Sequence, residues 1–412
     1  KGCQKVAVRQ QEVVVAVINK KKLTSPSALS ALTLSAMAIP SVASAAVVPE
    51  NKTLSVRYTQ YQENNMPVER VTSGSTARYG IDVLQLRYFT PVADKYSIDS
   101  SVQFETLSGA SPYGSSDNGN GQTEVTMSGA SIEETRVDAS VAGTRYFKEG
   151  TLTSSVYVSK ENDYQSLGLG LSGSLEINQK HTTLLGSVST SFDELSPTDA
   201  ALFGGGRADA DGKTKRSVSF YEGVTQVINK YSTLQLGVGY TRLKGHLSDP
   251  YRSKDLRPSL RAQTTVTAQY RHHLTQMGGM AWHLDYRFYQ DDWGVLANTI
   301  TSSVWKDFEV FGQHITLAPN VRYHWQHAAD FYTLATNPTA TQSFYSDDFR
   351  LSAYGAIAMG IDMQYHHKDM VLNLGLSQYF SAENWGLTGS QDTETPALVN
   401  FTTFSLGVDY LF

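Results

Sequence analysis

The C-terminal stretch Phe401–Phe412 carries the feature that most constrains the fold. Apolar side chains alternate there with polar or small ones, the apolar set being Phe404, Leu406, Val408, Tyr410 and Phe412 and the intervening set Thr403, Ser405, Gly407 and Asp409. A period of two predicts a β-strand with one apolar and one polar face. The final residue is aromatic and in register with the apolar face, which resembles a C-terminal signal for outer-membrane assembly.

Similar alternation recurs in roughly sixteen segments from Lys52 onward, each about the 9 to 11 residues or more that a tilted strand needs to cross a bilayer. The first segment presents Leu54, Val56 and Tyr58, and the fourteenth is expected to present Leu351, Ile357, Met359 and Ile361. The sequence therefore predicts an all-β fold, a transmembrane up-and-down antiparallel β-barrel of about 16 strands, over residues 46–412. A soluble secreted sandwich or adhesin is the rival, but it does not explain an apolar face on every segment.

The connections between segments give an independent test, because outer-membrane barrels alternate short periplasmic turns with long external loops. Short turns are expected at residues 91–94, 148–150, 178–180, 229–230, around 278–279, around Asp307-Phe308, and at 367–369. Long loops are expected at 63–78, 107–134, 194–213, 245–258, 328–343 and 381–397. This alternation places both termini on the periplasmic side. Aromatic residues near strand ends, such as Trp293, Trp305 and Trp325, are expected to form interfacial girdles.

The N-terminal region has the pattern of an export signal. Lys20, Lys21 and Lys22 precede an apolar run that ends at Ala43-Ser44-Ala45, which predicts a signal peptide over residues 20–45. Residues 1–19 are interpreted as untranslated leader, since the sequence contains no Met before Met37, or else as an extension. The expected localisation is the bacterial outer membrane.

Charge and cysteine content exclude several functions. Residues 1–45 hold six of the 34 Lys and Arg and one of the 39 Asp and Glu, so the exported chain has 28 basic and 38 acidic groups. Nucleic acid is not an expected partner, because binding phosphates requires a basic surface. The sole cysteine, Cys3, precedes the signal, so no disulfide, iron–sulfur cluster or c-type haem is expected. No cofactor is predicted.

Charged residues at inward positions of the expected strands are candidate lumen and selectivity groups. They are Arg87, Arg136, Asp138, His283, Asp285, Arg287, Arg322 and Arg350, with His324 and Asp362. In a water-filled lumen, opposed charges set up a field that orients permeating solutes. The alternative is that they pair with one another and hold the barrel's shape.

Acidic residues gather at the expected outer rim. Asp291, Asp292, Asp347 and Asp348 are candidate metal ligands, with Asp249, Asp255 and Asp330 nearby. Grouped carboxylates bind Ca²⁺ through oxygen, or the divalent cations that bridge lipopolysaccharide. A solvated acidic loop surface is the alternative.

Enzyme signals are poor. Outer-membrane proteases and lipases place Asp, His or Ser groups at the rim, but no spacing here sets a nucleophile beside its base. The pairs His272-His273 and His366-His367 point to opposite faces of a strand, so neither pair chelates one metal. A barrel hydrolase therefore stays only as a lesser alternative.

Several stretches resemble a family of proteobacterial outer-membrane proteins catalogued only as a domain of unknown function. They are Ser108–Tyr113, Ser128–Ser131, Leu247–Arg252, Asp255–Pro258, His283–Trp293, Asp348–Ser352 and Gly407–Tyr410. The resemblance runs from about Lys20 to Phe412. Members are often encoded beside a small lipoprotein, a thioredoxin-like protein and a flavin transferase. The resemblance thus implies a link to envelope redox chemistry or export, and implies no catalytic residues.

Two functional classes follow. One is a porin-like channel for small polar solutes. The other is a non-enzymatic export conduit or scaffold for a periplasmic lipoprotein or flavinylated protein. Expected partners in either case are outer-membrane lipid, lipopolysaccharide and the barrel assembly machinery. We also expect the long loop from Leu107 to Glu134 to fold over or into the mouth, because a lumen of this width is otherwise an open hole.

Overall fold

The fold is described from a computed structural model. It covers residues 47–412 except 118–121, 129–131, 204, 276–277, 335–342 and 388–394. The expected leader and signal peptide, residues 1–45, lie outside the described residues. Among the described residues, no helix is both long and apolar enough to cross a membrane.

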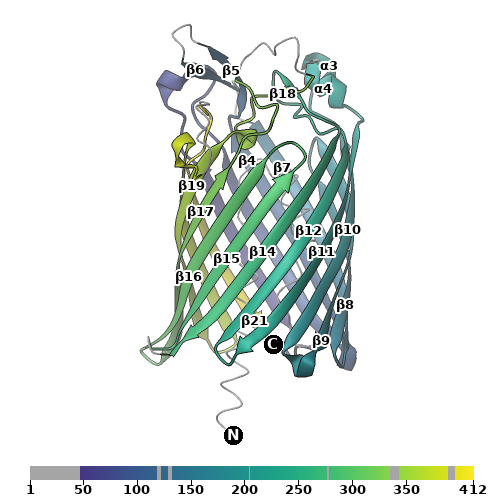
Figure 1. Ribbon diagram of the computed structural model, residues 1–412, viewed down its shortest axis with the longest axis vertical. Coiled ribbons are helices and arrows are strands. Elements are labelled where there is room, and N and C mark those ends of the chain that lie inside the picture. Colours follow the sequence, from purple (N-terminus) through teal and green to yellow (C-terminus); the bar gives the residue numbers. More distant parts are fainter. Residues whose placement is uncertain are drawn as a thin grey trace.

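In the described part of the chain, sixteen strands form one closed antiparallel barrel (Figure 1). Chain neighbours are barrel neighbours throughout, which is the predicted up-and-down order. The strands are β1 (Thr53–Glu63), β3 (Gly80–Val92), β4 (Tyr96–Gly109), β7 (Ile132–Phe147), β8 (Gly150–Lys160), β9 (Tyr164–Ile177), β10 (Thr182–Leu195), β11 (Thr214–Asn229), β12 (Ser232–Gly245), β14 (Leu260–Leu274), β15 (Met280–Asp291), β16 (Leu296–Val310), β17 (Gln313–Gln326), β19 (Tyr354–His367), β20 (Met370–Ala382) and β21 (Phe401–Leu411).

The alternation of apolar and polar residues in the sequence corresponds to the outward and inward faces of the barrel wall. On β9 the leucines Leu167, Leu169, Leu171 and Leu175 are exposed on the outside, while the residues between them face inward. Strands β1 and β21 pair along their full lengths and close the ring. Closure matters because hydrocarbon offers no partner to an unpaired backbone group.

Short turns join the strands at the end of the barrel where β1 begins and β21 ends (Figure 1). We call this end periplasmic. It includes the 3-10 turns η3 (Ala93–Lys95) and η4 (Asn178–Lys180). One turn lies later than expected: β16 continues to Val310, and Phe311 and Gly312 form the turn with φ of 52° and 72°. The strand extends because Phe308 and Val310 continue the outward apolar face.

Long connections lie at the opposite, external end, where they contain small elements of their own. These are η2 (Val68–Arg70), β2 (Val71–Ser73), β5 (Pro112–Asp117), β6 (Thr123–Met127), α3 (Ala200–Phe203), α4 (Gly205–Ala210), β13 (Asp255–Leu256), β18 (Tyr345–Ser346), η6 (Phe349–Leu351) and η7 (Glu383–Trp385). Strands β2, β6 and β5 form one small sheet, and β13 and β18 form another.

Three sequence predictions about apolar side chains are wrong. Leu351 lies in η6 rather than on a barrel strand, and it is buried among external loops. Trp293 is buried in the same loop cluster, and Trp305 is buried on an inward face against Ala318, so neither belongs to a lipid-facing girdle. Trp325 stacks on Tyr323 with ring centroids 5.2 Å apart. Periodicity alone does not say whether an aromatic side chain packs against lipid or against protein.

Candidate functional site

External loops converge over the mouth of the barrel. We define the cap as the described residues of the connections β1–β3 (64–79), β4–β7 (110–131), β12–β14 (246–259), β17–β19 (327–353) and β20–β21 (383–400). Four barrel strands separate the root of β4–β7 from that of β12–β14 and from that of β17–β19, and two strands separate β12–β14 from β17–β19. The β4–β7 connection therefore touches the other two only by reaching across part of the opening.

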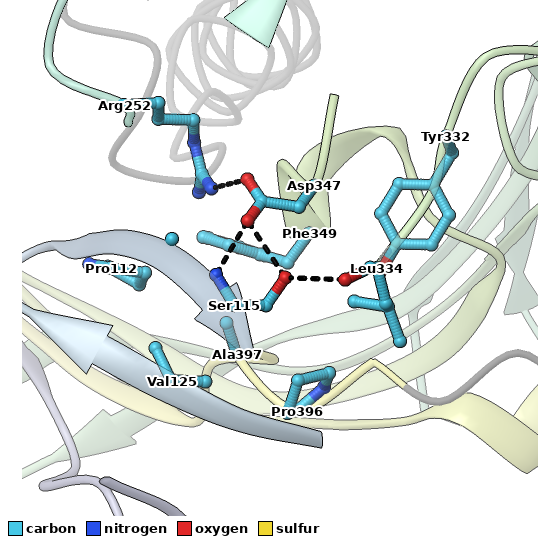
Figure 2. Close-up of a pocket in the computed structure, with 11 residues that line it drawn as sticks. Pro112, Ser115, Val125, Arg252, Tyr332, Leu334, Asp347, Phe349, Pro396 and Ala397 are labelled. Carbon is cyan, nitrogen blue, oxygen red and sulfur yellow. Dashed lines mark hydrogen bonds and ion pairs between the residues drawn. The ribbon is translucent and has the colours of Figure 1, made fainter. Parts of the chain in front are cut away.

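One contact set joins these three connections (Figure 2). Arg252, from β12–β14, donates a hydrogen bond of 2.7 Å to Asp347, from β17–β19. The other oxygen of Asp347 accepts from the backbone N–H and the hydroxyl of Ser115 on β5, at 2.7 and 2.8 Å. The Ser115 hydroxyl also lies 3.3 Å from the carbonyl of Leu334. The expected folding of the 107–134 loop over the mouth is therefore seen in its described part.

A second contact set centres on Asp348, whose side chain is fully buried. It accepts from Arg257 at 2.8 Å and from Arg350 at 2.6 Å. Arg350 also reaches Asp249 at 2.7 Å, and Arg257 binds Asp255 at 2.8 Å. These charges are removed from water, which is costly unless each has a hydrogen-bonded counter-charge. The observed pairing meets that requirement.

The arginines determine the protonation of these carboxyl groups. Burial alone would raise the pKa of Asp348, but Arg350, Arg252 and Arg257 outweigh burial and hold the pKa well below its usual range. The pKa of Asp249 is lowered in the same way, against burial, by the same arginines. Both groups are therefore ionised at neutral pH.

Apolar packing supports the ionic contacts. One buried cluster joins cap residues to inward side chains near the outer strand ends: Tyr61, Met66, Ile81, Leu107, Ala110, Val125, Met127, Phe349, Ala356, Tyr379, Ala397, Val399 and Phe401. A second joins Trp293, Val295, Ala329, Phe331 and Leu351. The cavity between the loops in Figure 2 measures about 10 Å³, which is room for about one water molecule. The cap is thus packed like a protein interior at this point.

Below the cap the barrel wall carries charges that water reaches. Arg87 on β3 and Asp99 on β4 point inward and form a bidentate pair, yet 44% and 34% of their side chains stay exposed. Arg136 and Asp138 pair at 2.8 Å on β7 and are buried near the outer end. Asp285 binds Arg271 at 2.6 Å across β15 and β14.

The remaining predicted lumen residues are placed in three different ways. Arg287 and Arg322 lie on inward faces of β15 and β17. His283 is buried, stacked on Trp305 with centroids 5.7 Å apart. Arg350 does not lie on a barrel strand, because η6 carries it into the ion cluster of the cap.

The predicted metal ligands are occupied by protein donors. Asp291 accepts from Arg261 at 2.6 Å and from the backbone N–H of Trp293 at 3.0 Å, so it closes the β15–β16 turn. Asp292 accepts from the N–H of Ala262 at 2.9 Å. Asp347 and Asp348 belong to the cap, as described above.

Another set of carboxylates has the spacing of metal ligands. Oxygens of Glu134, Glu161 and Asp163 lie within 4.8 Å of one another at the outer ends of β7 and the β8–β9 turn. Burial raises the pKa of Glu161 to about 8 despite the opposing effect of Arg136, and Asp163 and Glu134 add repulsion. Arg136 Nε lies 3.5 Å from Glu161. The group has the oxygen chemistry that a hard divalent cation prefers.

A family model described as "Protein of unknown function (DUF3570)" matches residues 28–398. The chain belongs to this family. Stretches on which the DUF3570 resemblance rests, Ser108–Tyr113, Leu247–Arg252, Asp255–Pro258 and Asp348–Ser352, meet in the cap. Residues that sequence reasoning did not single out, chiefly Arg252 and Arg257, lie inside those stretches.

Three solved structures align with most of this chain at low sequence identity. A "Bacterial polysaccharide outer membrane secretin" aligns with a TM-score of 0.47 and 10% identity, covering 87% of this chain and 98% of that one. OccD3 (OpdP) of Pseudomonas aeruginosa aligns with a TM-score of 0.41 and 10% identity, covering 92% and 97%. OccK1 (OpdK) of the same organism gives 0.39 and 9%, covering 89% and 99%. No curated protein sequence matches this DUF3570 chain.

Proposed function

We propose that the protein is a porin-like channel of the bacterial outer membrane for small polar solutes, with the cap as its external gate. The observation that carries the proposal is the exposure of inward charges below the cap. Arg87 and Asp99 keep 44% and 34% of their side chains exposed inside the wall, although they are already paired with each other. Exposed opposed charges inside a barrel of this size are the setting in which solutes are oriented during permeation.

The cap suits a gate because non-covalent contacts between separate loops hold it. Arg252, Asp347 and Ser115 come from three connections, so moving any one loop breaks their contacts. Strand pairing in the ring does not depend on these contacts. The mouth therefore opens without unfolding the barrel.

A second candidate is a non-enzymatic export conduit or scaffold. The specific observation in its favour is the apolar packing of Phe349, Val125 and Ala397 against inward side chains, which makes the closed state compact. A permanently closed barrel has no use as a solute channel. In that case the expected role is to hold a periplasmic lipoprotein or flavinylated protein, as the family resemblance implies.

Planar-bilayer recording separates the two candidates. The wild-type protein should be mostly closed, and Arg252→Ala should conduct more often, because it removes the cation that ties β12–β14 to β17–β19. Lys213→Ala is the matched control, since this external lysine is exposed. Heat-modifiable migration on gels confirms that each variant is folded.

Two results would contradict these proposals. A folded Arg252→Ala barrel whose cap is cleaved by added protease, yet which passes no current, would rule out the channel and favour the scaffold. Fractionation tests the location: recovery from the soluble periplasm would contradict both candidates.

A further inference from the structure

Two arginines stand together on the inner wall beneath the cap. Arg287 on β15 lies opposite Thr299, and Arg322 on β17 lies opposite Thr301, so the two flank β16 in neighbouring rows. Arg287 is exposed to the lumen, and Arg322 is half-buried. Both side chains therefore point into the lumen from the same part of the wall.

Within the described residues, neither arginine has a carboxylate partner. Arg287 packs over the ring of Tyr289 at 5.6 Å instead. Two other inward arginines are neutralised, Arg87 by Asp99 and Arg271 by Asp285. Two adjacent cations without counter-charges raise the energy of an empty site, and this cost falls when an anion binds between them.

Neighbouring polar groups are already satisfied. His324, also opposite Thr299, shares hydrogen bonds with Thr299 at 2.9 Å and with Gln326 at 3.3 Å. Gln326 in turn donates to cap carbonyls, those of Arg350 and Ser352, at 3.0 and 2.7 Å. The two arginines therefore lie just below the cap.

We propose that Arg287 and Arg322 form a binding site for the oxyanion group of a small solute, a carboxylate or a phosphate, inside the lumen. Guanidinium groups present planar sets of donors that match the two oxygens of such groups. The inference rests on the proposed function and deepens it, because it names small anions as the solutes that the channel holds. The closed cap lies above the site, so an anion reaches it from the periplasmic end.

Calorimetric titration of the folded barrel in detergent tests the site without requiring conduction. Inorganic phosphate and, in parallel, succinate are the probes. The wild-type protein should bind at least one of them saturably. Arg287→Ala and Arg322→Ala should each weaken binding roughly 10- to 100-fold, the effect of losing a charge-assisted hydrogen bond.

Arg57→Ala is the matched control. Arg57 points inward on β1, opposite Gly407 and Gln85, so its loss removes the same charge from another part of the lumen. Its binding should equal that of the wild-type protein. Absence of saturable binding of both probes would overturn the inference, as would an equal loss in Arg57→Ala, which indicates diffuse attraction. Binding without conductance would reject the channel and support the anion site. Conductance without binding would support the channel and reject the anion site.

Discussion

Asp347 accepts two hydrogen bonds through one oxygen from Ser115, a residue 232 positions earlier in the chain, at 2.7 Å from the backbone N–H and 2.8 Å from the hydroxyl. The other oxygen binds Arg252. A single carboxylate thus joins three external connections, one of which, β4–β7, begins four strands away from the other two. A substitution of Asp347 is therefore the most direct test of whether these contacts hold the cap together.

Asp347→Asn should loosen the cap while the barrel stays folded. The substitution leaves Arg252 as a buried cation without its nearest partner, and breaking a buried pair costs about 3–5 kcal/mol. Protease cleavage within the cap of the folded protein should become much faster. Asp211→Asn is the control, because Asp211 is exposed on another external loop. Equal cleavage rates for the two variants would show that Asp347 does not hold the cap.

Acid should open the cap. The pKa values of Asp348 and Asp249 lie below their ordinary value of 3.8, so their ionic contacts stabilise the cap fully above that pH. This stabilisation is lost as pH falls below about 3.8 and through the lowered pKa values. Bilayer conductance should therefore be constant through the neutral range and rise only in strong acid. An opening transition near pH 6 would contradict this assignment.

Glu161 should have the opposite pH dependence. Burial raises its pKa from 4.5 to about 8, so the unfolded chain loses this proton at lower pH than the folded chain does. The free energy of unfolding therefore falls between those two pH values and levels off above them. Glu161→Gln should remove this fall and melt at a higher temperature than the wild-type protein at about pH 9. Heat-modifiable migration at about pH 5 and about pH 9 measures the difference.

Gly355→Ala should displace the β20–β21 loop. A Cβ atom at Gly355 would overlap the backbone carbonyl of Trp385 in η7. Gly386→Ala is the matched control, since a Cβ there meets nothing within 4 Å. Only the first substitution should speed hydrogen exchange in residues 383–387. Similar exchange in both variants would mean that η7 is not packed as described.

The lipid-facing register predicts unequal effects of charge on β8. Val156 points outward and is exposed, whereas its neighbour Ser155 points inward opposite Gly170. Val156→Arg should destabilise the membrane-inserted barrel by about 2–4 kcal/mol if it lies near the bilayer midplane. Ser155→Arg should cost less, because the lumen is polar. Denaturant unfolding in lipid vesicles measures both, and a reversed order would reject the register.

The barrel wall could be predicted from the sequence because the bilayer imposes one simple rule. Lipid requires an apolar side chain at every second position, so Leu167, Leu169 and Leu171 already define β9 and its outward face. Alternating connection lengths then gave the two ends of the barrel.

The cap could not be predicted in this way, because its loops have no repeating environment. Arg252 meets Asp347 across 95 positions, and nothing in the local sequence of either residue specifies the other. Arg350 and Leu351 were assigned to a strand face, yet the N-cap residue of η6, Asp348, accepts from the N–H of Arg350, and the chain turns into the cap there. The family stretches indicated which loops matter without indicating their contacts.

The joint between β1 and β21 has a consequence for the order of assembly. These strands are the first and last of the ring, so their pairing joins the residues farthest apart in the chain, and we expect it to form last because non-local pairing is slow. Arg78 donates across this joint to the carbonyl of Ala397 at 3.1 Å, and Asn64 donates to Asn400 at 2.8 Å. These hydrogen bonds between the external loops therefore reinforce the pairing of β1 with β21. Weakening these loop contacts should therefore make it easier for β1 and β21 to separate, and so lower the mechanical strength of the ring.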